Sequence, residues 1–298
     1  MHTIQFTDDQ EILEFPSQLE EMNESQFIYF VELVLKFQQN TLKIEEFKTL
    51  LIRKLLDLRL SWKYFCACEE KKEAIMARVA QLSDLVESFF QEELRDNKAV
   101  KVLQLSFVKN FIPVICGKYH GPEDAITNLT FYEYRMAHNY YHDYIRNDNE
   151  ESLNWLIATI YRRKKPFYWL LAQLPWYNGE KRVHLSSQTN PRYLKKRAER
   201  ISKLPMAIRY GIFIFWAGCE DYLVTGRPVI DGNEIDLSIL YEKSGNGSSE
   251  GSLGLVGLLY SLAESKVFGS IQETDNQNLY DVMAKLYQDT KRLKEMPK

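Results

Sequence analysis

The sequence has few cysteines and no segment long enough and apolar enough to cross a membrane, and each absence excludes a class of protein. Four cysteines in 298 residues are too few for a disulfide scaffold. The start, MHTIQFTDDQ, lacks the basic and then apolar pattern of a secretory signal. The apolar run at 210–219, YGIFIFWAGC, has ten residues, whereas spanning a bilayer takes about 20. We therefore expect a cytoplasmic protein in which this run is a buried core helix.

The sequence also lacks the motifs of several enzyme classes. Gly117-Lys118 has neither the upstream glycine nor the following Ser or Thr of a phosphate loop, and no Gly-x-Gly-x-x-Gly follows a strand. Residues 247–251 fit the Gly-x-Ser-x-Gly pattern, but that nucleophile needs a later histidine, and none follows His184. We therefore expect no catalytic residues and no cofactor.

The composition is ordinary, but the charge is uneven. Hydrophobic residues make up 45% of the chain and aromatic residues 13%, a globular balance with an aromatic share that suits contact surfaces. The total charge of −3 hides net charges of −7 in residues 1–50, −2 in 51–160, +11 in 161–209 and −5 in 210–298. We call residues 161–209 the basic block. It either engages an acidic partner or nucleic acid, or is neutralised by the acidic ends of the chain.

Apolar residues that recur every three or four positions predict a mainly α protein, a multi-helix bundle-like domain with at most a small β-hairpin at 228–235. Thr130 and Glu133 form a capping box at one helix start, and Asn190 caps another before Pro191. One helix should close at residues 92–95, and another should end in the cations 162–165. The expected helices span residues 27–37, 44–58, 75–95, 131–147, 150–165, 192–204, 210–219, 253–262 and 278–293.

The Gly- and Ser-rich stretch EKSGNGSSEGS at 242–252 is a flexible linker by composition. It predicts a main helical domain over 1–241 and a C-terminal helical hairpin over 253–298, which either stands alone or packs on the main domain.

The basic block holds the candidate site. Its aromatic residues, dense in PFYWLLAQLPWY, could stack on single-stranded nucleic acid or could belong to the core. The residues we expect to bind a polyanion or an acidic partner are its clustered cations, Arg162, Arg163, Lys164, Lys165, Arg192, Lys195, Lys196, Arg197 and Arg200.

Two sets of residues, one of histidines and one of three cysteines with a histidine, are candidate metal sites. His138 and His142 lie four residues apart on one face of an expected helix, the spacing of two zinc ligands in metalloproteases, but no third ligand is identifiable. Cys66, Cys68, Cys116 and His120 come close to zinc-finger spacing without matching it. We expect no metal at either place, and a metal-dependent enzyme at His138 and His142 stays a third hypothesis.

Several strings in order resemble a family of uncharacterised proteins encoded near the tail-assembly genes of tailed phages and prophages of gut bacteria. They are TLKIEEFK at 41–48, KNFIP at 109–113, GP at 121–122, NLTFYEYRMA at 128–137, LIATIY at 156–161 and VFG at 267–269. The resemblance implies a non-catalytic structural or assembly protein that acts through protein–protein contacts. It assigns no functional residues.

The leading hypothesis is therefore a phage or prophage tail-region protein in the bacterial cytoplasm, or incorporated in a virion. Its expected partners are other phage-type structural or assembly proteins, or further copies of itself, and no membrane. The alternative is a nucleic-acid-binding module that uses the basic block.

Overall fold

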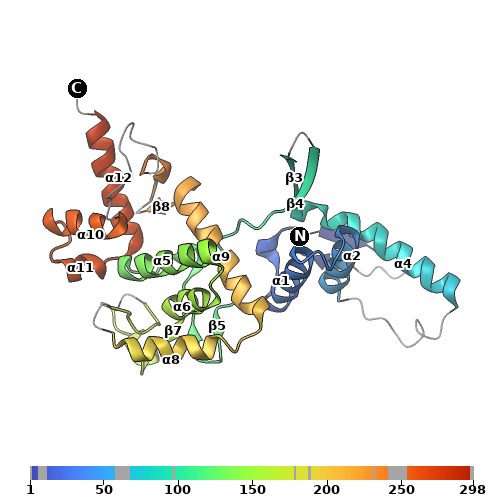
Figure 1. The fold of residues 1–298 in the computed structure, drawn as a ribbon, viewed down its shortest axis with the longest axis horizontal. Helices are drawn as coiled ribbons and strands as arrows, with labels where there is room; N and C mark the ends of the chain where they lie inside the picture. The colour runs from blue at the N-terminus through green and yellow to red at the C-terminus, as the bar shows by residue number, and fades with distance from the viewer. Residues whose placement is uncertain are drawn as a thin grey trace. The chain divides into compact units, whose positions relative to one another are not determined.

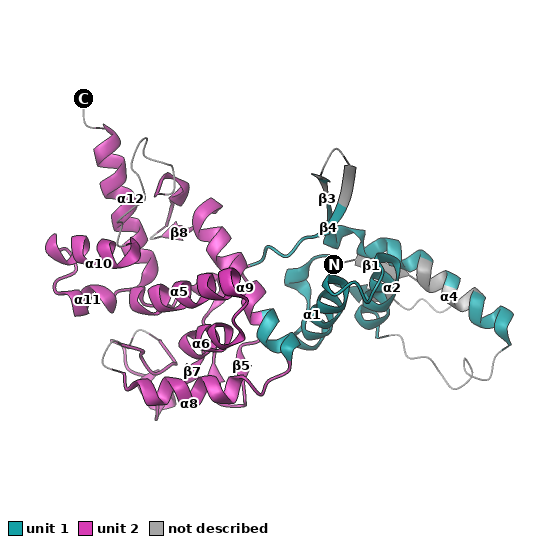
Figure 2. Ribbon diagram, viewed as in Figure 1, with its two compact units in different colours: residues 1–107, 206–211 teal, residues 108–205, 212–298 magenta. Residues whose placement is uncertain are grey.

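The computed structural model divides the chain into two compact units (Figures 1 and 2). Unit 1 holds residues 1–107 and 206–211, and unit 2 holds residues 108–205 and 212–298. This division differs from the predicted one: the units do not divide at 242–252, which lies outside the described residues, and the expected C-terminal hairpin belongs to unit 2. The structure describes residues 2–5, 12–57, 68–95, 98–177, 179–186, 189–230, 232–240 and 254–295.

Unit 1 combines helices with two antiparallel strand pairs, β1 with β2 and β3 with β4. The expectation of a helix closing at 92–95 is wrong, because the backbone of that stretch pairs with β4 instead. The elements are β1 (His2–Gln5), β2 (Ile12–Phe15), η1 (Leu19–Glu21), α1 (Glu24–Gln38), α2 (Ile44–Leu55), α4 (Glu69–Ser83), η2 (Asp84–Phe89), β3 (Phe90–Arg95) and β4 (Lys98–Leu103).

Phenylalanine rings form much of the core of unit 1. The ring of Phe30 lies edge-on to Phe47 with centroids 5.9 Å apart, and Phe89 lies 6.3 Å from Phe30. All three side chains are buried. Edge-to-face pairs of this kind contribute about 0.5–1.5 kcal/mol beyond the burial of their area. The predicted apolar stripe of α1 is therefore confirmed as a core face.

Unit 2 is also mainly helical and carries a three-stranded antiparallel sheet, β5-β6-β7, and the hairpin β8-β9. Helix α5 lies against α6, and α6 lies against α8 (Figure 1). The elements are β5 (Val114–Ile115), β6 (Tyr119–His120), η3 (Asp124–Ile126), α5 (Phe131–Asn147), α6 (Glu150–Ile160), β7 (Arg162–Arg163), α7 (Tyr168–Leu171), α8 (Pro191–Ile201), α9 (Met206–Thr225), β8 (Val229–Ile230), β9 (Asn233–Glu234), η4 (Leu237–Leu240), α10 (Gly254–Glu264), α11 (Ile271–Asp275) and α12 (Leu279–Glu295). Residues 206–211 of α9 are counted in unit 1, and the rest of the helix in unit 2.

The predicted helix starts of unit 2 follow from local capping. The hydroxyl of Thr130 accepts from the backbone N–H of Glu133 (3.3 Å), and the Glu133 carboxylate accepts from the N–H of Thr130 (3.2 Å). Asn190 likewise accepts from the N–H of Arg192 (2.9 Å), and Pro191 opens α8. Both predicted caps are confirmed.

The mainly α class is confirmed, and the predicted hairpin at 228–235 is β8-β9. The run at 210–219 lies inside α9, where Trp216 and Cys219 are fully buried. No helix among the described residues has the length and apolarity needed to cross a membrane. The expectation that α6 continues to residue 165 is wrong, because the chain leaves the helix after Ile160 to form β7.

Candidate functional site

The basic block folds into a closed loop followed by helix α8. We call residues 163–183 the aromatic loop. Near its ends, the N–H of Lys165 donates to the carbonyl of Lys181 (2.8 Å), and the N–H of Val183 donates to the carbonyl of Arg163 (2.9 Å). These antiparallel bonds hold the two ends of the loop side by side.

The buried side chain of Arg162 holds the first end of the aromatic loop in place. Its guanidinium forms an ion pair with Glu133, with Nη2 3.0 Å from Oε2, and Nη1 donates to the carbonyl of Val183 (2.7 Å). The side chains of Arg162 and Glu133 are 2% and 0% exposed. Burial lowers the pKa of Arg162 to about 10, with Glu133 opposing the shift, so the guanidinium stays charged at neutral pH.

The buried side chain of Arg182 holds the second end of the loop in place, also through hydrogen bonds to backbone carbonyls. Its Nη2 donates to the carbonyl of Asn128 (2.8 Å) and its Nη1 to the carbonyl of Ile160 (3.2 Å) at the end of α6. Glu180 pairs with its Nε (2.9 Å). Burial alone would raise the pKa of Glu180, but the hydrogen bonds and charge of Arg182 outweigh it and lower the pKa. Two buried arginines thus fix both ends of the loop.

The aromatic loop exposes large apolar side chains to solvent. Single exposed apolar side chains are normal on a folded protein, so the feature of this loop is that several of them stand close together in the sequence. The hypothesis that the aromatic residues of the basic block belong to the core holds for Tyr161, which is fully buried, and is wrong for the exposed Phe167, Trp169 and Trp176, whereas Tyr168 and Tyr177 are half-buried. The exposed fractions are 72% for Phe167, 65% for Trp169, 50% for Leu170 and 77% for Trp176.

Tyrosine and lysine side chains brace the aromatic loop internally. The ammonium of Lys164 lies over the ring of Tyr168, 4.8 Å from its centroid, and the ammonium of Lys165 lies 2.9 Å from the hydroxyl of Tyr177. The two tyrosine rings meet edge-on with centroids 6.2 Å apart. Lys165 is therefore committed to the loop structure, whereas Lys164 stays exposed.

The nine predicted cations do not form one surface. The prediction that Arg162 binds a partner is wrong, because its side chain is buried and a partner cannot reach it. Arg197 donates to the carbonyls of Ala158 (2.7 Å) and Tyr161 (3.0 Å), and Arg200 donates to the hydroxyl of Tyr119 (2.8 Å), so these two contribute to structure. The exposed cations are Arg163 and Lys164 on the loop and Arg192, Lys195, Lys196 and Arg200 on α8, and of these Arg200 is held through its bond to Tyr119.

The two predicted histidines lie on α5, and both are half-buried. The rings of His138 and His142 are 4.3 Å apart, and Nδ1 of His138 lies 2.9 Å from Oε1 of Glu220. Burial and the neighbouring His138 lower the pKa of His142. Among the residues that the structure describes, no group of three His, Cys, Asp or Glu could hold a metal ion. Of the cysteine set, Cys66 lies outside those residues, and Cys68 and Cys116 are exposed.

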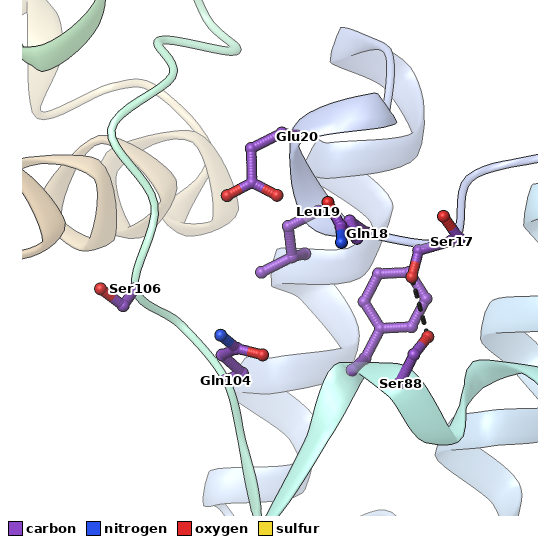
Figure 3. Close-up of a pocket in the computed structure, with 8 residues that line it drawn as sticks. Ser17, Gln18, Leu19, Glu20, Ser88, Gln104 and Ser106 are labelled. Atoms are coloured by element: carbon purple, nitrogen blue, oxygen red, sulfur yellow. Dashed lines mark hydrogen bonds between the residues drawn. The ribbon is translucent and has the colours of Figure 1, made fainter. Parts of the chain in front are cut away.

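Unit 1 contains a polar pocket of about 340 Å³ (Figure 3). Its wall holds hydroxyls, amides and one carboxylate, and the hydroxyl of Ser88 donates to the carbonyl of Ser17 (2.8 Å). With no histidine or lysine in its lining, the pocket lacks a serine–histidine or serine–lysine pair. The lining residues are Ser17, Gln18, Leu19, Glu20, Ser88, Phe89, Gln104 and Ser106.

Sequence reasoning missed the residues that build the base of the aromatic loop. Glu133 was identified only as a helix cap, and Arg182 and Glu180 were not singled out within the basic block. A signal existed in the sequence: Glu180 is one of only two acidic residues among the 13 cations of the basic block, which favours a paired role.

The chain matches no protein-family model, no curated protein and no solved structure in comparisons with each.

Proposed function

We propose that this chain is a non-catalytic binding protein that docks a protein partner through the aromatic loop. The observation that carries the proposal is the exposure of Phe167, Trp169 and Trp176 on a loop whose two ends are fixed by buried arginines. Exposed apolar patches on a folded protein mark interaction sites. Trp and Tyr are also the residues that most often dominate binding energy at protein interfaces.

The rigid base of the loop strengthens the proposal. A loop that must be ordered on binding loses affinity, whereas one already held in place does not. Arg162 binds the backbone carbonyl of Val183 at the second end of the loop, and Arg182 binds those of Ile160 and Asn128 outside the loop. Burying a guanidinium group is favourable only when partners of this kind compensate for the lost water. The loop is therefore preorganised to present its aromatic residues.

The charges on the loop indicate the chemistry of the partner. Arg163, Lys164 and Lys181 are exposed on the same loop as the aromatic residues. Cations of this kind speed association with an acidic surface and disfavour a basic one. The partner surface we propose has an apolar pocket for the tryptophans and acidic side chains around it.

The short strings that resemble phage and prophage proteins contribute to the scaffold under the loop. The amide of Asn110 donates to the carbonyl of Pro122 (2.7 Å), the hydroxyl of Tyr161 donates to Asn110 (3.2 Å), and the carbonyl of Asn128 receives Arg182. Residues far apart in the sequence thus meet where the loop is held. We accordingly propose that the partner is a structural or assembly protein of a phage or prophage tail.

The test is direct binding between the full chain and the purified products of its neighbouring genes, measured by calorimetry. Trp169→Ala with Trp176→Ala should weaken binding roughly 1,000-fold, since two interface tryptophans that each contribute about 2 kcal/mol sum to about 4 kcal/mol, and about 1.4 kcal/mol is a factor of ten. The matched control is Tyr193→Ala, because Tyr193 is 68% exposed on α8 outside the loop. Equal affinity of the double variant and the wild type would contradict the proposal.

Nucleic-acid binding is the second candidate, and one observation favours it: Arg192, Lys195 and Lys196 are exposed together near the start of α8, with Tyr193 beside them. Retention on single-stranded DNA should then fall steeply with salt and be lost in Lys195→Glu with Lys196→Glu. No retention at low salt eliminates this candidate and leaves the protein-partner proposal untouched.

A further inference from the structure

Unit 2 contains a second hollow that shares no lining residue with the aromatic loop. It is a cavity of about 630 Å³ between α5, α10 and α12, within the range of pockets that bind small molecules. Its apolar lining includes Leu255, Leu258, Met283 and Leu286, together with Val256, which is 37% exposed. The cavity therefore offers an aliphatic wall that solvent can reach.

The polar side chains of the cavity gather on α5. Arg135, His138 and Asn139 lie three and four positions apart, so they share one face of the helix, and all three line the cavity. Thr290 adds a hydroxyl from α12. One polar patch in an otherwise aliphatic wall is the arrangement that orients a ligand with one polar end.

Two of these polar groups are already fixed in position. Arg135 donates to Oδ1 of Asp275 through Nε (3.1 Å) and Nη2 (2.5 Å). Nδ1 of His138 lies 2.9 Å from Glu220, which also accepts from the hydroxyl of Tyr134 (2.9 Å). These contacts occupy Nε and Nη2 of Arg135 and Nδ1 of His138. Within the described part of the chain, Nη1 of Arg135, Nε2 of His138 and the amide of Asn139 have no hydrogen-bond partner.

The charges around the cavity select the head group of a ligand. Asp275 neutralises Arg135, and Glu220 places a second carboxylate beside His138. A carboxylate ligand would place a third negative charge near the carboxylates of Asp275 and Glu220, which repel it. An ammonium ligand would be repelled by the guanidinium of Arg135. An uncharged oxygen of a ligand can accept hydrogen bonds from Arg135, His138 and Asn139 without repulsion from either kind of charge.

We propose that this cavity binds a small apolar molecule with an uncharged hydroxyl or carbonyl at one end. The aliphatic body packs against α10 and α12, and the oxygen accepts hydrogen bonds from the α5 wall. This site is independent of the aromatic loop, so binding of the ligand and docking of a protein partner are separable properties of the chain.

The experiment titrates the full chain with 1-octanol, octanoate and octylamine in a calorimeter. Octanol should bind saturably and more tightly than the two charged probes. Asn139→Ala should weaken octanol binding roughly fivefold, the loss expected for one hydrogen bond. Octanoate or octylamine binding more tightly than octanol would overturn the assignment of an uncharged head group.

Filling the cavity provides the decisive variants. Leu286→Trp and Val256→Trp should each weaken octanol binding at least roughly tenfold, because the new ring occupies the site. The matched control is Leu293→Trp on the same helix as Leu286, since Leu293 is 70% exposed and outside the lining. Val256 is partly exposed, so its variant keeps the test valid if Leu286→Trp fails to fold. No saturable octanol binding, or equal loss in Leu293→Trp, would overturn the proposal.

Discussion

The carboxylate of Glu133 lies against the guanidinium of Arg162 with both side chains almost fully buried, at the point where the chain leaves α6 for the aromatic loop. The same carboxylate completes the cap of α5 by accepting from the N–H of Thr130, and it also accepts from the N–H of Leu185 (3.2 Å) beyond the loop. One buried group therefore couples a helix start to both ends of the aromatic loop.

Removing the charge of Glu133 should destabilise the protein strongly. Glu133→Gln leaves Arg162 charged and buried without its counter-ion, a loss of about 3–5 kcal/mol when one partner of a buried pair is removed. Urea unfolding followed by far-ultraviolet circular dichroism measures the free energy of unfolding. The double variant Glu133→Leu with Arg162→Met should lose less than the sum of the two single losses.

The exposed Glu199 of α8 provides the control for that experiment. Glu199→Gln removes a carboxylate at the surface, where substitutions change the free energy of unfolding by no more than about 0.5 kcal/mol. A Glu133→Gln variant as stable as Glu199→Gln would show that the buried pair does not hold the base of the loop.

Acid should loosen the second end of the loop through Glu180. Arg182 lowers the pKa of Glu180 below its ordinary value of 4.5, against the effect of burial. A carboxyl with a lowered pKa in the folded state contributes stability above pH 4.5 and loses it as the pH falls through the folded value. We expect Glu180→Gln to flatten the loss of stability below pH 4.5, measured by unfolding at several pH values. An unchanged acid profile would contradict this coupling.

The sequence predicts the parts of the fold that depend on contacts between residues close together in the chain. Thr130 with Glu133 and Asn190 with Pro191 define helix starts through contacts within a few residues, so both were identified from spacing alone. The strand at 90–95 was missed because its polar and apolar order also fits a helix, and only its pairing with residues 98–103 decides the structure.

The candidate site depended on contacts that spacing does not reveal. Arg162 and Lys164 are two residues apart, yet one is buried against Glu133 and the other is exposed. Arg182 reaches carbonyls 22 and 54 positions away in the sequence. A count of charges located the basic block, but only the tertiary structure separates the cations that hold the loop from those that face solvent.

Cysteine reactivity should differ sharply between the two kinds of cysteine in the described residues. Cys219 is fully buried in α9, and burial raises the pKa of its thiol, whereas Cys116 is exposed. In a variant that keeps Cys219 as its single cysteine, Ellman's reagent should react only after unfolding. The matching variant that keeps Cys116 should react in the native state. Rapid native reaction of Cys219 would show that the α9 core opens readily.

Tryptophan quenching tests the exposure of the aromatic loop without any partner. Trp169 and Trp176 are 65% and 77% exposed, whereas Trp216 is fully buried. Iodide should therefore quench the loop tryptophans strongly, and more than caesium does, because Lys164 and Lys181 attract the anion. Trp62 lies outside the described residues, and the half-buried Trp155 of α6 would add its own quenching, so the measurement uses a background with Trp62→Phe and Trp155→Phe.

In that background, Trp169→Phe with Trp176→Phe should remove most of the iodide-accessible fluorescence and leave the emission of Trp216 unaffected. The exchange of one exposed aromatic ring for another keeps the free energy of unfolding within about 0.5 kcal/mol, so a change in accessibility cannot come from unfolding. If the double variant keeps the quenching of its parent, the loop tryptophans are buried in solution, and the surface proposed to dock a partner does not exist in the free protein.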